Sequence, residues 1–207
     1  MATCSSSGRS GKGKSGGATT AKESKATVQE LNPEESQMWS EDPSIYQRLA
    51  DPKRMDSAAE ELDDDGYSLE EIQEFQDLAF KIRDMAESQT VRGVTTLYRG
   101  EQFSTLAAAE AKYKVGSEVS TTQLTSYATD IDVAKAYSKQ GSPKVSVVVT
   151  NTSKRGDFAG VRLQHQGEKP GQGVEVITPK GLKSRVKSTK FDKSTNTLFV
   201  EMENAGL

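Results

Sequence analysis

The clearest periodic pattern in the chain lies between residues 68 and 88. Ser68 and Glu71 match the capping box that begins a helix. Apolar side chains then recur every three or four residues, at Leu69, Ile72, Phe75, Leu78, Ile82 and Met85. This spacing puts them on one face of a helix. The pattern therefore predicts an amphipathic helix packed against a core.

The region around this helix, from residue 33 to residue 88, is acidic and rich in helix-favouring residues. Shorter helices are predicted at 44–49 and 56–62. Three large side chains are the expected packing anchors: Trp39, Ile45 and Tyr46. We therefore expect a helical subdomain here.

From residue 94 onward the pattern changes to β-branched or alternating runs separated by Gly, Pro, Asn and Ser. Strands are predicted at 94–99, 144–150, 157–163, 174–178, 184–191 and 197–202. One more helix is predicted at 132–139, with Val133, Ala134 and Tyr137 on one face. Helices followed by strands, with one helix inserted, are typical of an α+β domain.

Residues 1–32 contain mainly Ser, Gly, Thr, Ala and Lys, with few large apolar side chains. Such a segment buries too little surface to offset the entropy of ordering it, so we expect a disordered tail. The predicted organisation is this tail, a helical N-terminal subdomain at 33–92 and a β-rich core at 93–207.

Two short motifs suggest ligand binding but lack the necessary context. Residues 8–15 match the P-loop pattern G-x-x-x-x-G-K-S, yet no apolar strand precedes them and no amphipathic helix follows. The acidic run at 63–66 lacks the alternating spacing and the distant Glu of a calcium loop. We interpret the first as low-complexity sequence and the second as a helix end with a turn at Gly66.

Charge and composition narrow the possible chemistry. The chain has 27 basic and 30 acidic residues, a near balance that disfavours an extended grip on nucleic acid. Its single cysteine, Cys4, and single histidine, His165, disfavour an internal disulfide and a protein-built zinc site. No apolar run is long enough to span a membrane and no secretory signal is visible. We expect a soluble protein made in the cytoplasm, with export by a signal-independent route also consistent.

Three segments of the C-terminal half carry candidate chemistry: 97–100 (Leu-Tyr-Arg-Gly), 124–127 (Leu-Thr-Ser-Tyr) and 173–177 (Gly-Val-Glu-Val-Ile). Arg99, expected at a strand end that points into a cleft, suits phosphate because a guanidinium donates two parallel hydrogen bonds and stays charged. Glu175 is a carboxylate in an apolar strand, which is costly unless it is paired or faces a cleft. The simpler alternatives are a surface arginine in a turn and an outward-facing strand glutamate.

In order and setting, these segments resemble the catalytic segments of mono-ADP-ribosyltransferases of the bacterial-toxin type, which use Arg, Ser and Glu. The resemblance covers about residues 94–203. It includes Gly116 before a strand, the triplet Ser126-Tyr127-Ala128 at the family's Ser-Thr-Ser position, and the helix pattern at 133–137. It implies a core of two small packed β-sheets around an NAD cleft, with NAD as substrate and no metal.

The resemblance also implies a role for each residue. Arg99 would hold the phosphates of NAD, and Gly100 would approach the nicotinamide carboxamide through its bare backbone. Ser126 would orient Glu175, and Tyr127 would add a ring beside the nicotinamide. Glu175 would bond a hydroxyl of the nicotinamide ribose and stabilise the cation that develops there. Alternatively, Ser126 only ends a strand ahead of a helix.

The chain departs from the family at Gly173. Relatives carry a second Glu or a Gln two residues before the catalytic Glu, where strand alternation keeps it on the same face. Glu168 or Gln172 from the same Gly-rich loop would have to turn toward the acceptor instead. The stretch 157–172 is the expected acceptor loop, and its His165 either contacts the acceptor or faces solvent. Arginine is not a safe acceptor assignment, because a guanidinium needs a nearby base.

The function implied is transfer of ADP-ribose from NAD to a macromolecular acceptor, with release of nicotinamide. A protein acceptor is favoured, a nucleic acid acceptor is left open, and no membrane partner is expected. Two alternatives stay open: an NAD glycohydrolase that uses water, and a degenerate domain of this fold that serves as a binding or structural module.

Overall fold

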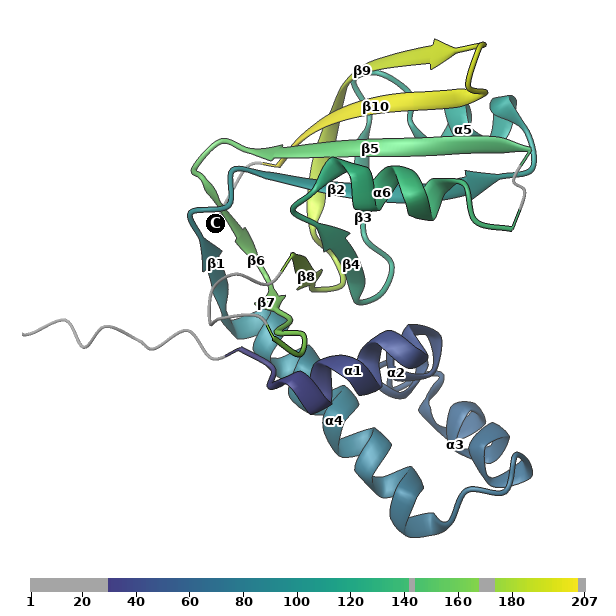
Figure 1. Cartoon of the computed structure of the whole chain (residues 1–207), viewed down its shortest axis with the longest axis vertical. Coiled ribbons are helices and arrows are strands. Elements are labelled where there is room, and N and C mark those ends of the chain that lie inside the picture. Colours follow the sequence, from purple (N-terminus) through teal and green to yellow (C-terminus); the bar gives the residue numbers. More distant parts are fainter. Residues whose placement is uncertain (1–29, 142–143, 168–173, 205–207) are drawn as a thin grey trace, which may run out of the picture.

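The computed structural model describes residues 30–141, 144–167 and 174–204, and Figure 1 shows their arrangement. The helices are α1 (Pro33–Glu41), α2 (Pro43–Leu49), α3 (Met55–Asp64), α4 (Leu69–Ser88), α5 (Leu106–Lys112) and α6 (Ile131–Ser138). The first strands are β1 (Thr90–Arg92), β2 (Thr96–Phe103), β3 (Glu118–Ser120), β4 (Thr125–Ala128) and β5 (Val145–Ser153). The others are β6 (Asp157–Ala159), β7 (Val161–Arg162), β8 (Glu175–Thr178), β9 (Lys183–Asp192) and β10 (Thr197–Asn204). The α+β prediction is confirmed.

The long amphipathic helix is confirmed as α4, which begins after the reciprocal capping box of Ser68 and Glu71. One detail of its predicted face is wrong: Leu69 is 81% exposed, because it belongs to the first turn, away from the packed part of the helix. The run at 63–66 ends α3 and turns at Gly66, which has a φ of 91°, as predicted.

Helices α1 to α4 share one apolar core with two short strands. Trp39, Ile45 and Tyr46 are buried in this core, so the predicted packing anchors are confirmed. The same core includes Leu163, just after β7, and Ile177 of β8. The helical layer therefore packs directly on the β7–β8 end of the sheet, at the bottom of the view in Figure 1.

The main sheet has eight strands in the order β3-β9-β10-β5-β2-β4-β8-β7, and β1 pairs with β6 separately. The pairing of β5 with β10 is parallel, while the other pairs are antiparallel. Strands β2 and β4 are joined at one residue pair, Tyr98 with Ala128, whereas β2 and β5 pair over eight. The sheet therefore consists of two strand groups, β3-β9-β10-β5-β2 and β4-β8-β7, with a weak junction between them.

Helices α5 and α6 cover opposite faces of the larger strand group. Ala109 of α5, and Tyr113 directly after it, pack with Val147 and Val149 of β5. On the other face, Ser146 donates a hydrogen bond to the carbonyl of Ser138 at the end of α6. Because side chains alternate along a strand, neighbouring residues of β2 face different helices.

Most predicted elements are present with shifted ends. The strand predicted at 157–163 is instead two strands, because Gly160, with a φ of 154°, bends the chain between β6 and β7. Two helices, α1 and α5, and three strands, β1, β3 and β4, lie outside the predicted helix and strand ranges. Of the predicted tail at 1–32, residues 1–29 lie outside the described residues, and with them the P-loop-like motif at 8–15. The end of the tail is ordered instead, because Leu31 is buried in the core of the helical layer and Asn32 caps α1. The division at residues 92 and 93 stays a prediction.

Candidate functional site

A cavity of about 440 Å³ lies where the two strand groups, α6 and the helical layer meet. Arg99, Gly100, Ser126, Tyr127 and Glu175 all line it. These are the five residues that the sequence assigned to catalysis and NAD binding, and they come from β2, β4 and β8. The structure therefore brings the three separate segments together, while the chemical role of each residue stays a prediction.

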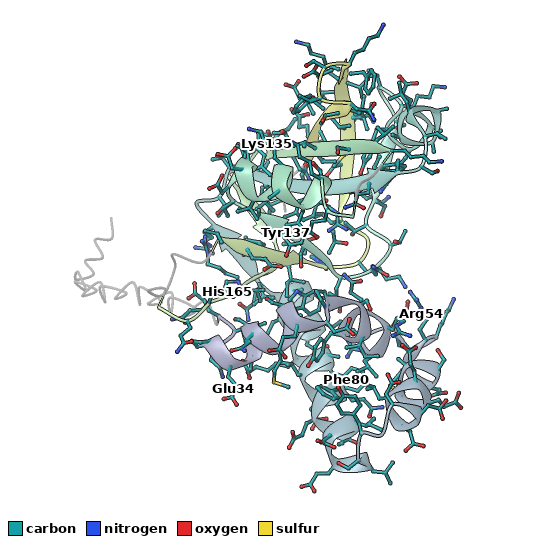
Figure 2. All side chains as sticks on the ribbon, turned by 45° about the vertical axis from the view of Figure 1, so that its right-hand side comes forward. Glu34, Arg54, Phe80, Lys135, Tyr137 and His165 are labelled. Carbon is teal, nitrogen blue, oxygen red and sulfur yellow. The ribbon has the colours of Figure 1, made fainter. Side chains whose placement is uncertain are left out.

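Two further walls of the cavity come from helices. Val133, Ala134 and Tyr137 contribute from α6, so the predicted shared face of that helix lines the cavity. Ser40 precedes the α1–α2 turn, and the remaining helical contacts are Pro43 and Gln47 of α2. In Figure 2, Tyr137 and His165 lie between the α6 region of the sheet and the helices at the bottom of the view.

Arg99 lies within β2, not at its end as expected. The strand continues to Phe103 because Gly100 and the residues after it keep pairing with β5. The Arg99 side chain starts on the face covered by α5, since Arg99 pairs with Val149. Its guanidinium crosses the weak β2–β4 junction, where Nη1 donates to the carbonyl of Ser126 at 2.7 Å. Arg99 thus lines both the large cavity and a smaller one, of about 120 Å³, on the α5 side.

Glu101 holds the other side of this guanidinium. Its Oε1 accepts from Arg99 Nε at 3.0 Å, and its Oε2 accepts from Lys112 Nζ at 2.7 Å and from the Tyr113 hydroxyl at 2.8 Å. Burial raises the pKa of Glu101, but the positive charges of Lys112 and Arg99 outweigh burial and hold the pKa below its usual value. The carboxylate is therefore ionised at neutral pH.

Ser126 lies on the same face of the β4–β8 ladder as Glu175. Ala128 pairs with Glu175 and Ser126 pairs with Ile177, and alternate residues of a strand share a face. The Ser126 hydroxyl oxygen accepts a hydrogen bond from the indole nitrogen of Trp39 at 3.2 Å. Because this contact uses the oxygen as an acceptor, the hydroxyl proton stays available to another partner.

Glu175 is the first residue of β8, and its side chain is 22% exposed. His165 approaches it from the segment after β7, with Nε2 at 3.5 Å from Glu175 Oε2. A backbone bond from the Leu163 N–H to the Glu175 carbonyl, at 3.0 Å, ties this segment to β8. His165 therefore lies at the wall of the cavity beside the carboxylate.

Gly100 is required by packing against α6. An added Cβ would lie 2.1 Å from the Ala134 carbonyl oxygen and 2.6 Å from the Ser138 nitrogen. No side chain fits there without displacing the helix. The sequence indicated only that the bare backbone could approach a ligand, and the close contact with the helix was not predicted.

Three tyrosines supply aromatic surface to the cavity, Tyr98, Tyr127 and Tyr137. Tyr127 is buried, and burial raises the pKa of its hydroxyl to about 12. Its ring centroid lies 6.0 Å from the Arg99 guanidinium. Tyr137 is 57% exposed at the rim. Such a mixture of rings and few polar groups is typical of a small-molecule site.

The three acceptor-loop candidates, Glu168, Gln172 and Gly173, lie outside the described residues. Glu101 and Trp39, which hydrogen-bond to Arg99 and Ser126, are among the contributors to the site that were not predicted from the sequence. Glu101 follows Arg99 by two positions in a strand, so alternation alone places both on one face and could have identified it. Trp39 was expected only as a packing anchor, and nothing in the local sequence indicates its bond to Ser126.

Within residues 30–141, 144–167 and 174–204 no group of three or more His, Cys, Asp or Glu side chains could hold a metal ion. In the same ranges no helix is both long and apolar enough to cross a lipid bilayer. The polar groups that line the cavity are suited to an organic ligand that carries phosphate and aromatic rings.

Known structures with a similar fold are bacterial ADP-ribosyltransferases and toxin domains. The Vis toxin, an ADP-ribosyltransferase from Vibrio splendidus, has a TM-score of 0.51 at 15% identity, covering 84% of this chain and 74% of that one. An ADP-ribosyltransferase from Clostridium botulinum has a TM-score of 0.52 at 14% identity, with coverage of 84% and 87%. A C-terminal toxin domain from Yersinia entomophaga has a TM-score of 0.51 at 14% identity, with coverage of 86% and 100%.

No family model and no curated protein matches the sequence. The structural similarity is nevertheless enough to show that the chain has the fold of the ADP-ribosyltransferases. At these identities the similarity concerns the fold alone, and the activity must be argued from the cavity.

Proposed function

We propose that this chain transfers ADP-ribose from NAD to a macromolecular acceptor and releases nicotinamide. One observation carries the proposal: Arg99, Ser126 and Glu175, distant in sequence, line one cavity together with three tyrosines. A phosphate-binding cation, a hydroxyl and a carboxylate around aromatic surface match the chemical groups of NAD.

Arg99 binds the pyrophosphate in this proposal. Its Nε and Nη1 are used by Glu101 and by the Ser126 carbonyl, while Nη2 has no hydrogen-bond partner among the described residues. A guanidinium fixed at two nitrogens has its remaining donors oriented before the ligand arrives. The aromatic rings beside it cover the nicotinamide and exclude water.

Glu175 stabilises the positive charge that develops on the nicotinamide ribose. The bond between ribose C1′ and the nicotinamide nitrogen breaks, and its electron pair leaves with the ring, which becomes neutral nicotinamide. The carboxylate lowers the energy of the cationic sugar as the bond lengthens. An acceptor atom then forms the new bond to C1′ and loses a proton. These steps require no metal.

The acceptor side is formed by the wall that carries His165. Its imidazole lies beside the Glu175 carboxylate and lines the cavity, so it can take the proton that the acceptor loses. Proteins are the acceptors we favour, since toxin domains are among the similar structures, and a role as a toxin-like effector follows from the same reasoning. A nucleic acid acceptor is the other macromolecular case.

A second candidate is an NAD glycohydrolase that uses the same cavity with water as acceptor. Gly173 favours it, because the position two residues before Glu175 has no side chain to orient a macromolecule. The chemistry at the ribose is unchanged, and only the atom that attacks C1′ differs.

The two activities, and their absence, are separated by incubating the protein and its Glu175→Gln variant with NAD labelled in the ADP-ribose part, with and without cell lysate. A labelled macromolecule that the variant does not form supports the transferase. Free labelled ADP-ribose with no labelled macromolecule supports the glycohydrolase. A wild-type protein that neither binds millimolar NAD nor releases nicotinamide contradicts both and favours a binding module.

A further inference from the structure

The partly buried carboxylate of Glu101 accepts hydrogen bonds from three donors: Arg99 of β2, Lys112 of α5 and Tyr113 just after α5. Its side chain is 15% exposed. All of these contacts lie on the α5 face of β2, behind the large cavity rather than inside it. Glu101 does not line that cavity, so it does not act on a ligand there directly.

Charge explains why a lysine joins this pair. A lone Arg99–Glu101 pair would be neutral and would attract a phosphate weakly. With Lys112 Nζ at 2.7 Å from the same carboxylate, two cations share one anion, and the cluster keeps a net positive charge. Phe103 and Tyr113 flank the lysine, with ring centroids 5.6 Å and 5.1 Å from Nζ. These rings and the carboxylate hold the ammonium group in place, while 42% of the lysine side chain stays exposed.

Geometry explains why the carboxylate is needed. Arginine side chains are flexible, and fixing one on ligand binding costs entropy. Here Nε is bound by Glu101 and Nη1 by the Ser126 carbonyl, which sets the plane of the guanidinium across the β2–β4 junction. A guanidinium held on two edges presents Nη2 in one direction.

We infer that Glu101 is a positioning residue that fixes Arg99 for an anionic ligand before it binds, and that Lys112 keeps the resulting site positively charged. The inference rests on the proposed function and deepens it, because the anion that it concerns is the pyrophosphate of NAD. It separates two roles: Glu101 provides orientation and Lys112 provides charge.

Kinetics of nicotinamide release test these roles. Glu101→Gln should raise the KM for NAD about ten-fold, the usual effect of losing one charge-assisted hydrogen bond, with a smaller change in kcat. The KM of Glu101→Asp should lie between the KM of the wild type and that of Glu101→Gln. Lys112→Met should raise the KM about three-fold and leave a weaker dependence of KM on salt. The Glu101→Gln effect should shrink in an Arg99→Lys background, because the residue acts through Arg99.

A matched control is available at Glu203. This glutamate also bonds two lysines, Lys154 at 3.0 Å and Lys187 at 3.5 Å, but it lines neither cavity that contains Arg99. Glu203→Gln should leave the KM unchanged. Equal KM values for Glu101→Gln and Glu203→Gln, in an active and folded protein, overturn the inference and leave the proposed function standing.

A second measurement works without any enzymatic activity. In ¹⁵N-labelled protein without NAD, the Arg99 Nε–H should exchange slowly with water, and Glu101→Gln should accelerate that exchange at least about ten-fold, as expected when a charge-assisted hydrogen bond is lost. Glu203→Gln should not change it. Rapid exchange of Arg99 Nε–H in the wild-type protein, equal to that of the exposed Arg155, overturns the inference whether or not the protein uses NAD.

Discussion

The two chemical walls of the cavity are built in different ways. Around Arg99, three contacts from the described residues fix the side chain: Glu101, the Ser126 carbonyl and the ring of Tyr127. Near Glu175, the contact is with His165, whose Nε2 lies 3.5 Å from Glu175 Oε2. Glu175 is also the first residue of its strand, whereas Arg99 lies inside one. Under the proposed function, the wall around Arg99 is the phosphate wall, and its contacts with the core orient it before the ligand binds. The wall around Glu175 is the ribose wall, and it lies beside His165, where an acceptor would enter.

The largest effect is expected on the ribose wall. Glu175→Gln keeps the size of the side chain but removes the negative charge that we propose stabilises the cationic sugar. We expect kcat for nicotinamide release to fall about 10²–10³-fold, with little change in the affinity for NAD. Steady-state kinetics and NAD binding should be measured together. A variant with unchanged kcat would show that the carboxylate has another role.

A substitution of Arg99, on the phosphate wall, should change KM rather than kcat. Arg99→Lys keeps the charge but loses the fork that bonds Glu101 and the Ser126 carbonyl, so the effect should fall on KM. We expect a loss of about 1.5–3 kcal/mol in kcat/KM, or about ten-fold to one-hundred-fold. If kcat falls as much as in Glu175→Gln while KM is constant, the proposed division between the walls is wrong.

Gly100→Ala tests the wall that α6 forms. The new Cβ would lie 2.1 Å from the Ala134 carbonyl oxygen, so the helix must move. Overpacking of this kind costs about 1–3 kcal/mol of unfolding free energy. Denaturant unfolding measures the cost, and the KM for NAD should rise because α6 lines the cavity. An alanine variant as stable as wild type would contradict the packing described here.

Trp39→Phe tests the hydrogen bond that links the helical layer to the site, and its expected effect is smaller. It keeps an aromatic ring in the core but removes the donor to the Ser126 hydroxyl. We expect a cost of about 1 kcal/mol in stability and a fall of a few-fold in kcat. Tyr46→Phe changes a residue of the same core that does not line the cavity, and it should not change kcat. Equal kcat values for both variants would show that the indole bond has no functional role.

The smallest expected effect is the loss of folding stability at acidic pH that Glu101 causes. Its pKa is lower in the folded protein than the usual glutamate value of about 4.3. A lowered folded pKa means that the contribution to stability is fully present above the usual value and is lost as pH falls through the folded pKa. Between about pH 5 and pH 3 the melting temperature of wild type should therefore fall more steeply than that of Glu101→Gln. If the melting temperatures of both proteins fall equally with pH, the ion pairs of Glu101 with Arg99 and Lys112 do not contribute to stability as described.

The helices and strands that could be predicted from the sequence are those whose patterns depend on residues close together in the chain. Capping at Ser68, the apolar period of α4 and the alternation of the long strands all reflect neighbouring residues, and they recur in the structure. Convergence of Arg99, Ser126 and Glu175 was expected from resemblance, since no local pattern relates residues so far apart.

Contacts between distant segments account for what was missed. The bond from Trp39 to Ser126 joins residues 87 positions apart, and the fit of Gly100 beneath α6 depends on a helix that begins at Ile131. The position of Arg99 inside β2 also depends on pairing with β5. Glu101, by contrast, could have been identified from the sequence alone, because its spacing from Arg99 places both side chains on one face of the strand.

The most direct test is a crystal structure of Glu175→Gln with NAD, in which slow turnover preserves the ligand. We predict that the pyrophosphate lies within hydrogen-bond distance of the Arg99 guanidinium and that a hydroxyl of the nicotinamide ribose lies beside position 175. NAD bound elsewhere, or bound in the cavity with its phosphates directed away from Arg99, would contradict this prediction.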